Sequence, residues 1–306
     1  MRAVTYPAYS TDLSTLRVEE LPQPKLAPSA VLIEVRAASV NPVDWKVMTG
    51  GLDGLLDAVF PVIPGWDVAG VVVGLGPDTP EFAVGDEVIA YARKDTVGAG
   101  TFAELVAVPA VSVARKPTSL SFEQAAGLPL AGGTALRTLD ALDVSAGDTV
   151  LIHAAAGGVG AFAVQIAVAR GARVIGTASE SNHAFLRELG AEPVAYGDGV
   201  VDRVRGLAPD GVDAVADFVG GQLETSRAVL ADGGRLASVA DPGVIEHRGR
   251  WIWVRPDGAE SARLAALADE GALTVEVAQT FSLDQVAEAF AESQTGHVRG
   301  KLIIVP

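Results

Sequence analysis

Strand-like and helix-like segments alternate from residue 148 onward, and this alternation restricts the fold more than any other feature of the sequence. The expected strands are residues 149–154, 173–177, 193–196, 212–219 and 234–240, and the expected helices are residues 158–170, 182–189 and 222–230. Gly171 and Gly190 directly follow two of these helices, as glycine often does at helix C-termini. Repeated strand–helix units of this kind predict a parallel sheet with helices on both faces.

The first 120 residues or so have a different texture. They are rich in valine, glycine and proline, and turn signals separate short apolar runs at residues 31–35, 70–74, 87–91 and 102–108. Such spacing is typical of a compact all-β unit.

The end of the chain is expected to return to this β unit. Residues 301–305 are again strand-like and follow a predicted helix at residues 283–292. Ser121 is expected to cap the first helix of the strand–helix region. The predicted domains are residues 1–120 for the β domain, 121–270 for the strand–helix domain and 271–306 for the return to the β domain.

Composition and charge exclude several classes of partner. The formal net charge of −15 would repel nucleic acid and anionic membrane surfaces, so we expect neither as a partner. With 49% hydrophobic and 20% charged residues, the chain can bury a sizeable core. It contains no cysteine, which excludes disulfides and thiolate metal ligands and fits a reducing compartment. We therefore expect a cytoplasmic protein.

One uncharged stretch, residues 149–169, is long enough to suggest a membrane span. It contains Gly157, Gly158 and Gly160, and it is better interpreted as a strand, a glycine turn and a helix. The N-terminus also lacks the apolar run of a signal peptide. We expect no membrane-spanning segment.

The glycine turn lies where a strand ends and a helix begins. A dinucleotide pyrophosphate needs close backbone approach and free N–H groups at a helix N-terminus. Gly157 permits that approach, and Gly160 permits close packing of helix on strand, although Ala155 replaces the usual first glycine. The turn predicts a dinucleotide site, with a purely structural turn as the alternative. The expected cofactor contacts here are Ala156, Gly157, Gly158, Val159 and Gly160.

The end of the second strand predicts the cofactor type. NAD enzymes usually place an acidic residue there to bind the ribose 2′-hydroxyl, but here no acid precedes Glu180. The missing carboxylate leaves room for a 2′-phosphate, which favours NADPH, although no Lys or Arg stands beside Ser179. The alternative role for Ser179 and Ser181 is helix capping. His183 is alternatively an ordinary exposed residue of the helix. The residues expected to contact this part of the cofactor are Thr177, Ser179, Asn182, His183 and Tyr196.

Two later strand ends are expected to line the nicotinamide ribose, because ligands of open parallel sheets bind outside the carboxyl ends of the strands. Phe218, Val219 and Gly220 form one of these ends, and Val239 belongs to the other. A plain core role is the alternative for Val219.

Six short motifs carry a family resemblance. They are residues 41–46, 64–70, 84–88, 128–135, 153–160 and 296–301. In their order and spacing they resemble the medium-chain dehydrogenase/reductase superfamily, specifically its zinc-independent quinone oxidoreductase branch, the ζ-crystallin-like group. The resemblance implies an α/β chain with a GroES-like β domain and a Rossmann domain with a doubly wound parallel sheet. It also implies an active site in the cleft between them.

The resemblance also explains why metal ligands are missing. Alcohol dehydrogenases of this superfamily hold zinc with a cysteine and a Gly-His-Glu segment, among others. Here Asn41 looks like the replacement of that cysteine, and residues 65–67 replace Gly-His-Glu. Without a Lewis acid to polarise an alcohol oxygen, alcohol oxidation is not expected, and we predict no metal site.

The resemblance places Asn41 and Thr134 near the nicotinamide. Asn41 is a candidate to bind the cofactor amide or a nascent oxyanion, with a turn role before Pro42 as the alternative. For Asp44 and Lys46, one would donate a proton and the other stabilise charge, or the two would form a structural ion pair. The predicted catalytic residues are therefore Asn41, Asp44, Lys46 and Thr134.

These features predict an NADPH-dependent enzyme that reduces a quinone or an α,β-unsaturated ketone. Such acceptors are already electrophilic, so hydride transfer to them needs no metal. Two alternatives remain: reduction of an enoyl thioester in lipid or polyketide synthesis, and a non-enzymatic NADPH-binding protein.

Two segments have two interpretations each. The aromatic run at residues 251–255 is either an edge strand for pairing in a homodimer, which we expect, or a wall of the substrate pocket. Arg299 and Lys301 stand at the entry to the last strand, where they would either contact the cofactor or be solvated charges. We include Arg299 among the cofactor-binding residues.

Overall fold

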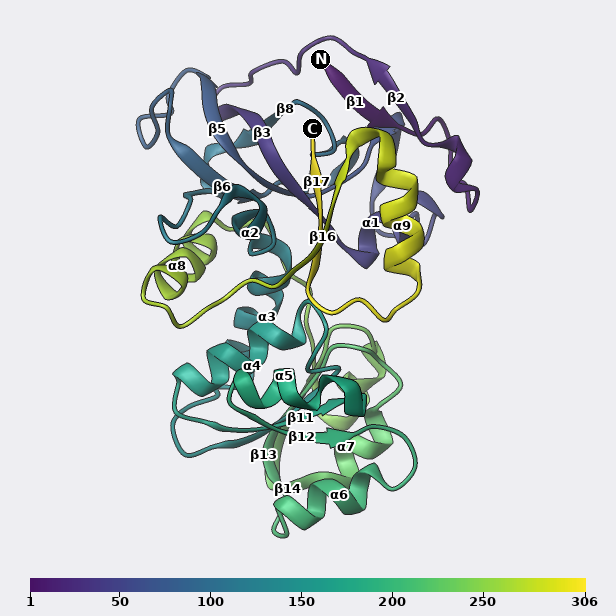
Figure 1. Ribbon diagram of the computed structural model, residues 1–306, viewed down its shortest axis with the longest axis vertical. Helices are drawn as coiled ribbons and strands as arrows, with labels where there is room; N and C mark the ends of the chain where they lie inside the picture. Colours follow the sequence, from purple (N-terminus) through teal and green to yellow (C-terminus); the bar gives the residue numbers. More distant parts are fainter. The chain divides into compact units, whose positions relative to one another are not determined.

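The computed structural model describes residues 1–306, and the chain forms two compact units (Figure 1). The first unit joins Met1–Leu130 with Arg255–Pro306, and the second comprises Ala131–Val254. The β domain is therefore discontinuous in sequence. The end of the chain returns to it, because β17 (Lys301–Val305) pairs antiparallel with β3 (Ala30–Val40).

The unit boundaries lie at 130/131 and 254/255, not at the predicted 120/121 and 270/271. Two helices account for the difference. The helix α2 (Phe122–Ala126) packs on β3, and α8 (Gly258–Asp269) packs on β9 (Val113–Arg115). Both helices therefore bury their apolar faces against the first unit. As predicted, Ser121 caps α2, accepting a hydrogen bond from the Gln124 N–H.

The first unit is built on a seven-stranded sheet with the order β16-β17-β3-β5-β6-β9, and β8 also pairs with β3. Two small two-stranded sheets, β1-β2 and β4-β7, complete it. The remaining strands of this unit are β1 (Arg2–Thr5), β2 (Arg17–Glu20), β4 (Asp57–Ile63), β5 (Asp67–Leu75), β6 (Glu87–Tyr91), β7 (Thr96–Ala99), β8 (Leu105–Pro109) and β16 (Val277–Ser282). Its other helices are α1 (Pro42–Met48) and α9 (Val286–Gln294), which lie side by side (Figure 1).

The second unit is a parallel sheet of six strands with the order β12-β11-β10-β13-β14-β15, which is the strand order of a Rossmann domain. Its strands are β10 (Thr149–His153), β11 (Arg173–Ala178), β12 (Ala191–Ala195), β13 (Val212–Asp217), β14 (Leu230–Ser238) and β15 (Arg250–Trp251). Its helices are α4 (Gly160–Ala169), α5 (His183–Glu188), α6 (Val200–Leu207) and α7 (Leu223–Val229), while α3 (Pro129–Ala141) begins at the junction. The helices α4 and α5 cover one face and α6 and α7 the other (Figure 1). This confirms the predicted fold class.

The middle strands of the second unit are buried on both faces, as the continuous apolar run at Val150, Leu151 and Ile152 predicts. The uncharged stretch from residue 149 to 169 folds as the strand β10, a turn and the helix α4. None of the helices combines the length and the apolar character required to cross a membrane.

Candidate active site

A buried polar cluster lies at one end of the first unit's sheet. Asn41 directly precedes α1, and its backbone N–H donates to Oδ2 of Asp44 at 2.7 Å. The Asp44 carboxyl group therefore satisfies a backbone donor at the start of the helix. Pro42, whose missing N–H needs no partner at this position, begins the helix.

The carboxamide of Asn41 lies between a lysine and an aspartate. Lys301 donates from Nζ to Asn41 Oδ1 at 2.6 Å, and Asn41 donates from Nδ2 to Asp67 Oδ2 at 2.9 Å. The strand pairing explains why these distant residues meet. Lys301 begins β17 and Asp67 begins β5, and both strands pair with β3, which ends beside Asn41.

Asp67 is fully buried and fully hydrogen bonded. Its Oδ2 also accepts from Ser39 Oγ at 2.7 Å, and its Oδ1 accepts from the Leu130 N–H at 2.8 Å. Several donors around one carboxylate stabilise its charge in the interior. No motif of the sequence points to Ser39, whereas Asp67 lies within the motif at residues 64–70 but was not predicted as a functional residue.

Burial shifts the proton affinities in this cluster. Burial, together with the nearby charge of Asp67, raises the pKa of Asp44 to about 8, against the opposing effects of the Asn41 N–H and Lys301. Asp44 is therefore largely protonated at neutral pH. Its Oδ1 is buried and has no hydrogen-bond partner, and the same holds for the hydroxyl of Tyr6. Burial also lowers the pKa of Lys301, which the carboxylates of Asp67 and Asp44 oppose.

Three cations near these segments lie in different surroundings. Lys46 is exposed, with Nζ 5.6 Å from the ring centroid of Trp45, and it forms no ion pair with Asp44, whose Oδ2 accepts from the Asn41 N–H and whose Oδ1 has no partner. Arg299 is also largely exposed and lies 3.4 Å from Glu276 Oε1. Lys301, for which a solvated charge was one interpretation, is instead only 4% exposed. A lysine that opens an otherwise apolar strand was the sequence signal for this burial.

The glycine turn of the second unit joins β10 to α4. A Cβ atom added at Gly160 would lie 2.2 Å from the carbonyl oxygen of Ala154, so only glycine allows this close approach. The Gly157 N–H donates to the same oxygen at 3.0 Å, and Ala154 itself has a left-handed φ of 54°. Gly157, Gly158 and Val159 are half-buried, whereas Ala156 is buried.

Thr177 stabilises this turn from the neighbouring strand β11. Its Oγ1 accepts from the Ala154 N–H at 3.2 Å, and its carbonyl oxygen accepts from the Ala155 N–H at 3.0 Å. Nδ1 of His153 lies 3.4 Å from the same hydroxyl, and Nε2 of His153 lies 3.3 Å from Ser226 Oγ. Burial lowers the pKa of His153 to about 4, so the imidazole is neutral.

Polar side chains gather after the end of β11. Ser179 Oγ lies 2.9 Å from Ser181 Oγ and accepts from Asn182 Nδ2 at 3.1 Å. The Ser179 side chain makes no capping hydrogen bond, so the alternative role of helix cap is not realised. His183 begins α5, and its Nε2 is buried without a partner.

Tyr196 follows β12 and is 62% exposed. Arg203 of α6 lies beside it and donates to the carbonyl oxygens of Ala195 at 3.0 Å and of Tyr196 at 3.4 Å. Sequence analysis missed this arginine, because it lies seven positions from Tyr196 and is brought back by the first turn of α6.

Asp217, the last residue of β13, binds the backbone that follows this strand. Its Oδ1 accepts from the N–H groups of Val219 at 3.0 Å and Gly220 at 2.9 Å, and its Oδ2 accepts from Ser238 Oγ at 2.8 Å. Val219 is 56% exposed, so the alternative core role for it is wrong. Phe218 and Val239 are half-buried.

The strand register brings most of the predicted cofactor residues to one edge of the sheet. Ile152 of β10 is paired with Gly176 of β11, and Asp217 of β13 is paired with both His153 and Ser238. Because the strands are parallel, their carboxyl ends share this edge. Arg299 is the exception, since it belongs to the first unit. Thr134 lies buried on α3 in the second unit, where its carbonyl oxygen accepts from Thr138 Oγ1 at 2.7 Å.

Comparisons with known proteins agree with this architecture. Residues 27–118 match the model of the alcohol dehydrogenase GroES-like domain, and residues 189–304 match a zinc-binding dehydrogenase model. The chain is 34% identical over 315 residues to the chloroplastic NADPH-dependent alkenal/one oxidoreductase of Arabidopsis thaliana. The alignment covers 100% of this chain and 80% of that protein. The chain is 33% identical to the 2-methylene-furan-3-one reductase of Solanum lycopersicum, covering 100% and 79%.

Among solved structures, the quinone oxidoreductase from Coxiella burnetii superposes with a TM-score of 0.88 at 35% identity, covering 100% of this chain and 99% of that chain. The chain belongs to the quinone oxidoreductase branch of the medium-chain dehydrogenase/reductase superfamily.

The residues of the polar cluster do not fit the zinc ion that the name of one matching family model implies. The chain has no cysteine, and Asn41 and Asp67 are engaged by each other and by an ammonium group. No group of three or more His, Cys, Asp or Glu side chains is arranged to hold a metal ion. A lysine cation cannot share this site with a divalent metal without losing its partners.

Proposed function

We propose that this protein is an NADPH-dependent reductase of α,β-unsaturated ketones and quinones. The observation that carries the proposal is the Asn41–Asp67–Lys301 network, which fills the segment where zinc-dependent relatives are expected to hold a metal. The printed names of two relatives, an alkenal/one oxidoreductase and a quinone oxidoreductase, support the same acceptor class.

Conjugated acceptors suit a site of this kind. NADPH, when bound, supplies the hydride. Addition of that hydride to the conjugated carbon leaves an enolate or a hydroquinone anion, so no metal is needed to make the acceptor electrophilic. What the chain must supply is alignment, exclusion of water and a source of protons. Asp44 holds a proton at neutral pH within the cluster, because burial raises its pKa to about 8.

The second unit would hold the nucleotide at the carboxyl edge of its sheet. We propose that the turn from Ala156 to Gly160 carries the pyrophosphate at the start of α4, a helix of ten residues. Phe218, Val219, Gly220 and Val239 would line the nicotinamide ribose. Asp217 fixes the first three of these, because it binds two of their backbone N–H groups.

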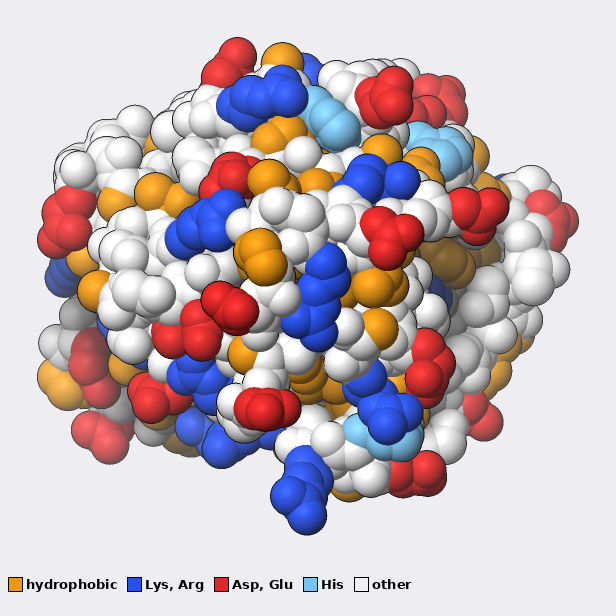
Figure 2. Space-filling view, turned by 90° about the horizontal axis from the view of Figure 1, so that it is seen from below, with side chains coloured by type: hydrophobic (Ala, Val, Ile, Leu, Met, Phe, Trp, Pro, Cys, Tyr) orange, Lys and Arg blue, Asp and Glu red, His pale blue; other side chains and the backbone are white.

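The preference for NADPH over NADH is part of this proposal. Ser179, Asn182 and His183 offer donors without a carboxylate at the end of β11, and Arg203 lies beside Tyr196. The net charge of −15 is not spread as acidic side chains alone, since Lys and Arg side chains are interspersed among acidic ones on the face shown in Figure 2.

For Asn41 the geometry favours an indirect role. Both ends of its carboxamide are engaged by Lys301 and Asp67, so we propose that it orders the site and does not contact the cofactor amide or an oxyanion. Thr134 keeps its proposed place near the nicotinamide. Lys46 is exposed and forms no contact with the cluster, so we propose no direct role for it, whereas Arg299 remains a proposed cofactor contact.

A homodimer and a cytoplasmic location also remain proposals. The edge strand β15 carries Trp251, and the rings of Trp251 and Trp253 are 6.1 Å apart, each residue being 39% exposed. An exposed sheet edge with aromatic side chains is suited to pairing between two copies, which sedimentation would detect as a doubled mass. A chain without cysteine is suited to the reducing cytoplasm, although the printed names of some relatives place them in chloroplasts.

The experiment is a panel of NADPH oxidation assays with 1,4-benzoquinone, 9,10-phenanthrenequinone, an alkyl vinyl ketone and crotonyl-CoA. Turnover of the first three compounds supports the proposal. Turnover of crotonyl-CoA alone would replace it with enoyl-thioester reduction. Tight NADPH binding without turnover of any acceptor would indicate a non-enzymatic nucleotide-binding protein.

A further inference from the structure

Lys301 begins a buried strand, which is an unusual place for a lysine. The residue is 4% exposed, and its neighbours Asn41 and Asp67 are 2% and 0% exposed. Burying an ammonium group costs several kcal/mol unless charge and hydrogen bonds balance it. A chain that needed only stability at this position would place an apolar residue there, as it does at the next four positions of β17.

The residues around Lys301 leave space for its side chain. A Cβ atom at Gly127 would lie 3.1 Å from Cγ of Lys301 and 2.9 Å from Cγ1 of Val275. Glycine at this position therefore makes room for the lysine stem. The ammonium group at its end reaches Asn41 Oδ1 at 2.6 Å and approaches the Val40 carbonyl oxygen at 3.4 Å.

Lys301 and Asp67 together leave the Asn41 carboxamide only one orientation. An ammonium group can only donate and a carboxylate can only accept, so the amide oxygen must face Lys301 and the amide nitrogen must face Asp67. Rotation of the amide by half a turn would replace both hydrogen bonds with repulsive contacts.

The cluster is also balanced in charge. It contains two carboxyl groups and one ammonium group, all buried. Burial raises the pKa of both carboxyl groups, but only Asp67 accepts hydrogen bonds at both of its oxygens. Asp67 is therefore the carboxylate that balances the Lys301 cation, and Asn41 bridges the two. Removal of either charge alone would leave the other uncompensated in the interior.

We propose that Lys301 is a positioning residue of the reductase, which acts through Asn41 and Asp67 to hold the start of α1 in the conformation that reduction requires. The Lys301 cation thus orders Asn41 and Asp67, whose positions resemble the metal-ligand positions of zinc-dependent relatives. This inference rests on the proposed reductase function.

The test compares Lys301→Met, Asp67→Asn and the double variant by urea unfolding and by kcat and KM with an alkyl vinyl ketone. Each single variant unfolds at lower urea than the wild type, because each leaves one unbalanced buried charge. The double variant is neutral again, so it recovers most of the lost stability. Its kcat nevertheless stays lower by about tenfold or more, because the Asn41 amide is no longer held, while KM for NADPH changes less than about twofold.

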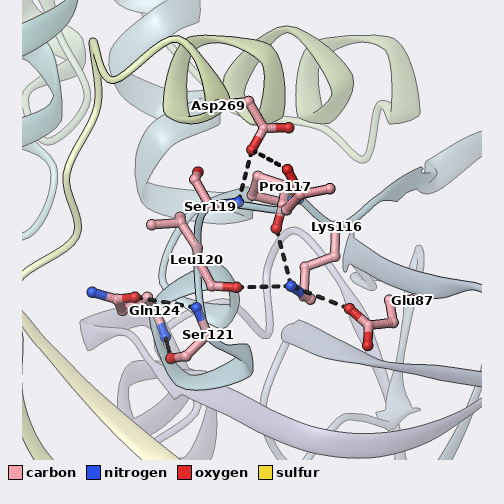
Figure 3. Close-up of polar contacts among 9 residues, drawn as sticks. Glu87, Lys116, Pro117, Ser119, Leu120, Ser121, Gln124 and Asp269 are labelled. Carbon is pink, nitrogen blue, oxygen red and sulfur yellow. Dashed lines mark hydrogen bonds and ion pairs between the residues drawn. The ribbon is translucent and has the colours of Figure 1, made fainter.

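Lys116→Met is the matched control. Lys116 belongs to the same unit, its side chain is 6% exposed, and its Nζ lies 3.2 Å from Glu87 Oε2 (Figure 3). It also donates to the carbonyl oxygens of Pro117 and Leu120 and lies 5.2 Å from the centroid of the Phe122 ring, and none of these partners belongs to the Asn41 cluster. This variant loses stability but keeps the wild-type kcat within about twofold, since it removes the hydrogen bonds of a buried ammonium group that does not hold Asn41.

Recovery of both stability and kcat in the double variant would overturn the proposal, because Lys301 would then be purely structural. A double variant no more stable than Lys301→Met would overturn it too, because the charge balance would be wrong. Failure of the reductase function itself is distinguishable, since it would appear as a wild type that turns over none of the acceptors.

Discussion

The hydroxyl of Thr177 accepts a hydrogen bond from the backbone N–H of Ala154 at 3.2 Å and so ties the strand β11 to the start of the glycine turn. Thr177 was predicted to contact the cofactor, but its side chain is buried and engaged with the turn. Its contribution to nucleotide binding would then be to keep the turn in shape.

The variant Thr177→Val tests this relationship. It keeps the shape of the side chain but leaves the Ala154 N–H without an acceptor, which costs about 1–3 kcal/mol. We expect weaker NADPH binding by fluorescence titration and a lower midpoint of urea unfolding. Thr79→Val is the control, because the Thr79 hydroxyl donates to Gly76 O in the other unit. Equal NADPH affinities in both variants would contradict the role of Thr177.

Gly160→Ala should disrupt the approach of α4 to β10. The added Cβ would meet the Ala154 carbonyl oxygen at 2.2 Å, and this backbone atom can move only with the turn. We expect a loss of stability and of NADPH binding. Gly206→Ala in the helix α6 is the matched control, since nothing lies within 4 Å of its added Cβ. It should stabilise the protein by about 0.5–1 kcal/mol, and a similar gain in Gly160→Ala would refute the argument.

Ser179→Asp tests the choice of cofactor. A carboxylate at the end of β11 would repel a 2′-phosphate but could bind the ribose 2′-hydroxyl of NADH. We expect NADPH affinity to fall at least about tenfold more than NADH affinity, measured by calorimetry at fixed ionic strength. Ser179→Asn, which is similar in size but neutral, is the control. An equal loss for both cofactors would remove Ser179 from the phosphate site.

The buried Asp44 predicts a pH dependence of stability. Its pKa is about 8 in the folded protein and near the ordinary aspartate value of 3.8 in the unfolded chain, so the folded state binds the extra proton between these values. The free energy of unfolding therefore falls as pH rises toward 8, by at most about 1.4 kcal/mol per pH unit for this group.

The measurement is urea unfolding of the wild type and of Asp44→Asn from pH 6.5 to 8. The window lies above the pH range in which His153 titrates, because the pKa of His153 is lowered to about 4 in the folded protein. The effect of His153 on stability has the opposite sign, since its contribution is fully present above pH 6.5 and is lost as pH falls toward 4. The wild type should lose stability relative to Asp44→Asn as pH rises. A constant difference across the window would show that Asp44 is ionised throughout.

Much of the fold was predictable, because local patterns determine it. The strands expected at residues 87–91 and 301–305 coincide with β6 and β17, and the alternation after residue 148 yields the parallel sheet. Helix starts were less accurate: the helix expected from residue 158 begins at Gly160, because the turn extends to Val159.

The polar cluster was only partly predictable, because pairing between distant strands creates it. Nothing local to Lys301 reveals that β17 lies against β3 with its first residue beside Asn41. Local sequence also suggested a pairing of Asp44 with Lys46, whereas α1 turns the first inward and leaves the second exposed. Arg203 was missed for a local reason, because only the first turn of α6 brings it back beside Tyr196, seven positions earlier.

The most direct test of the account is transfer of deuterium from NADPH labelled at nicotinamide C4 to an alkyl vinyl ketone, followed by NMR of the product, with protein treated with a metal chelator. We predict a saturated ketone with deuterium on the carbon β to the carbonyl, formed at the rate of untreated protein. Deuterium on the carbinol carbon, or activity that returns only after zinc is added, would contradict the account.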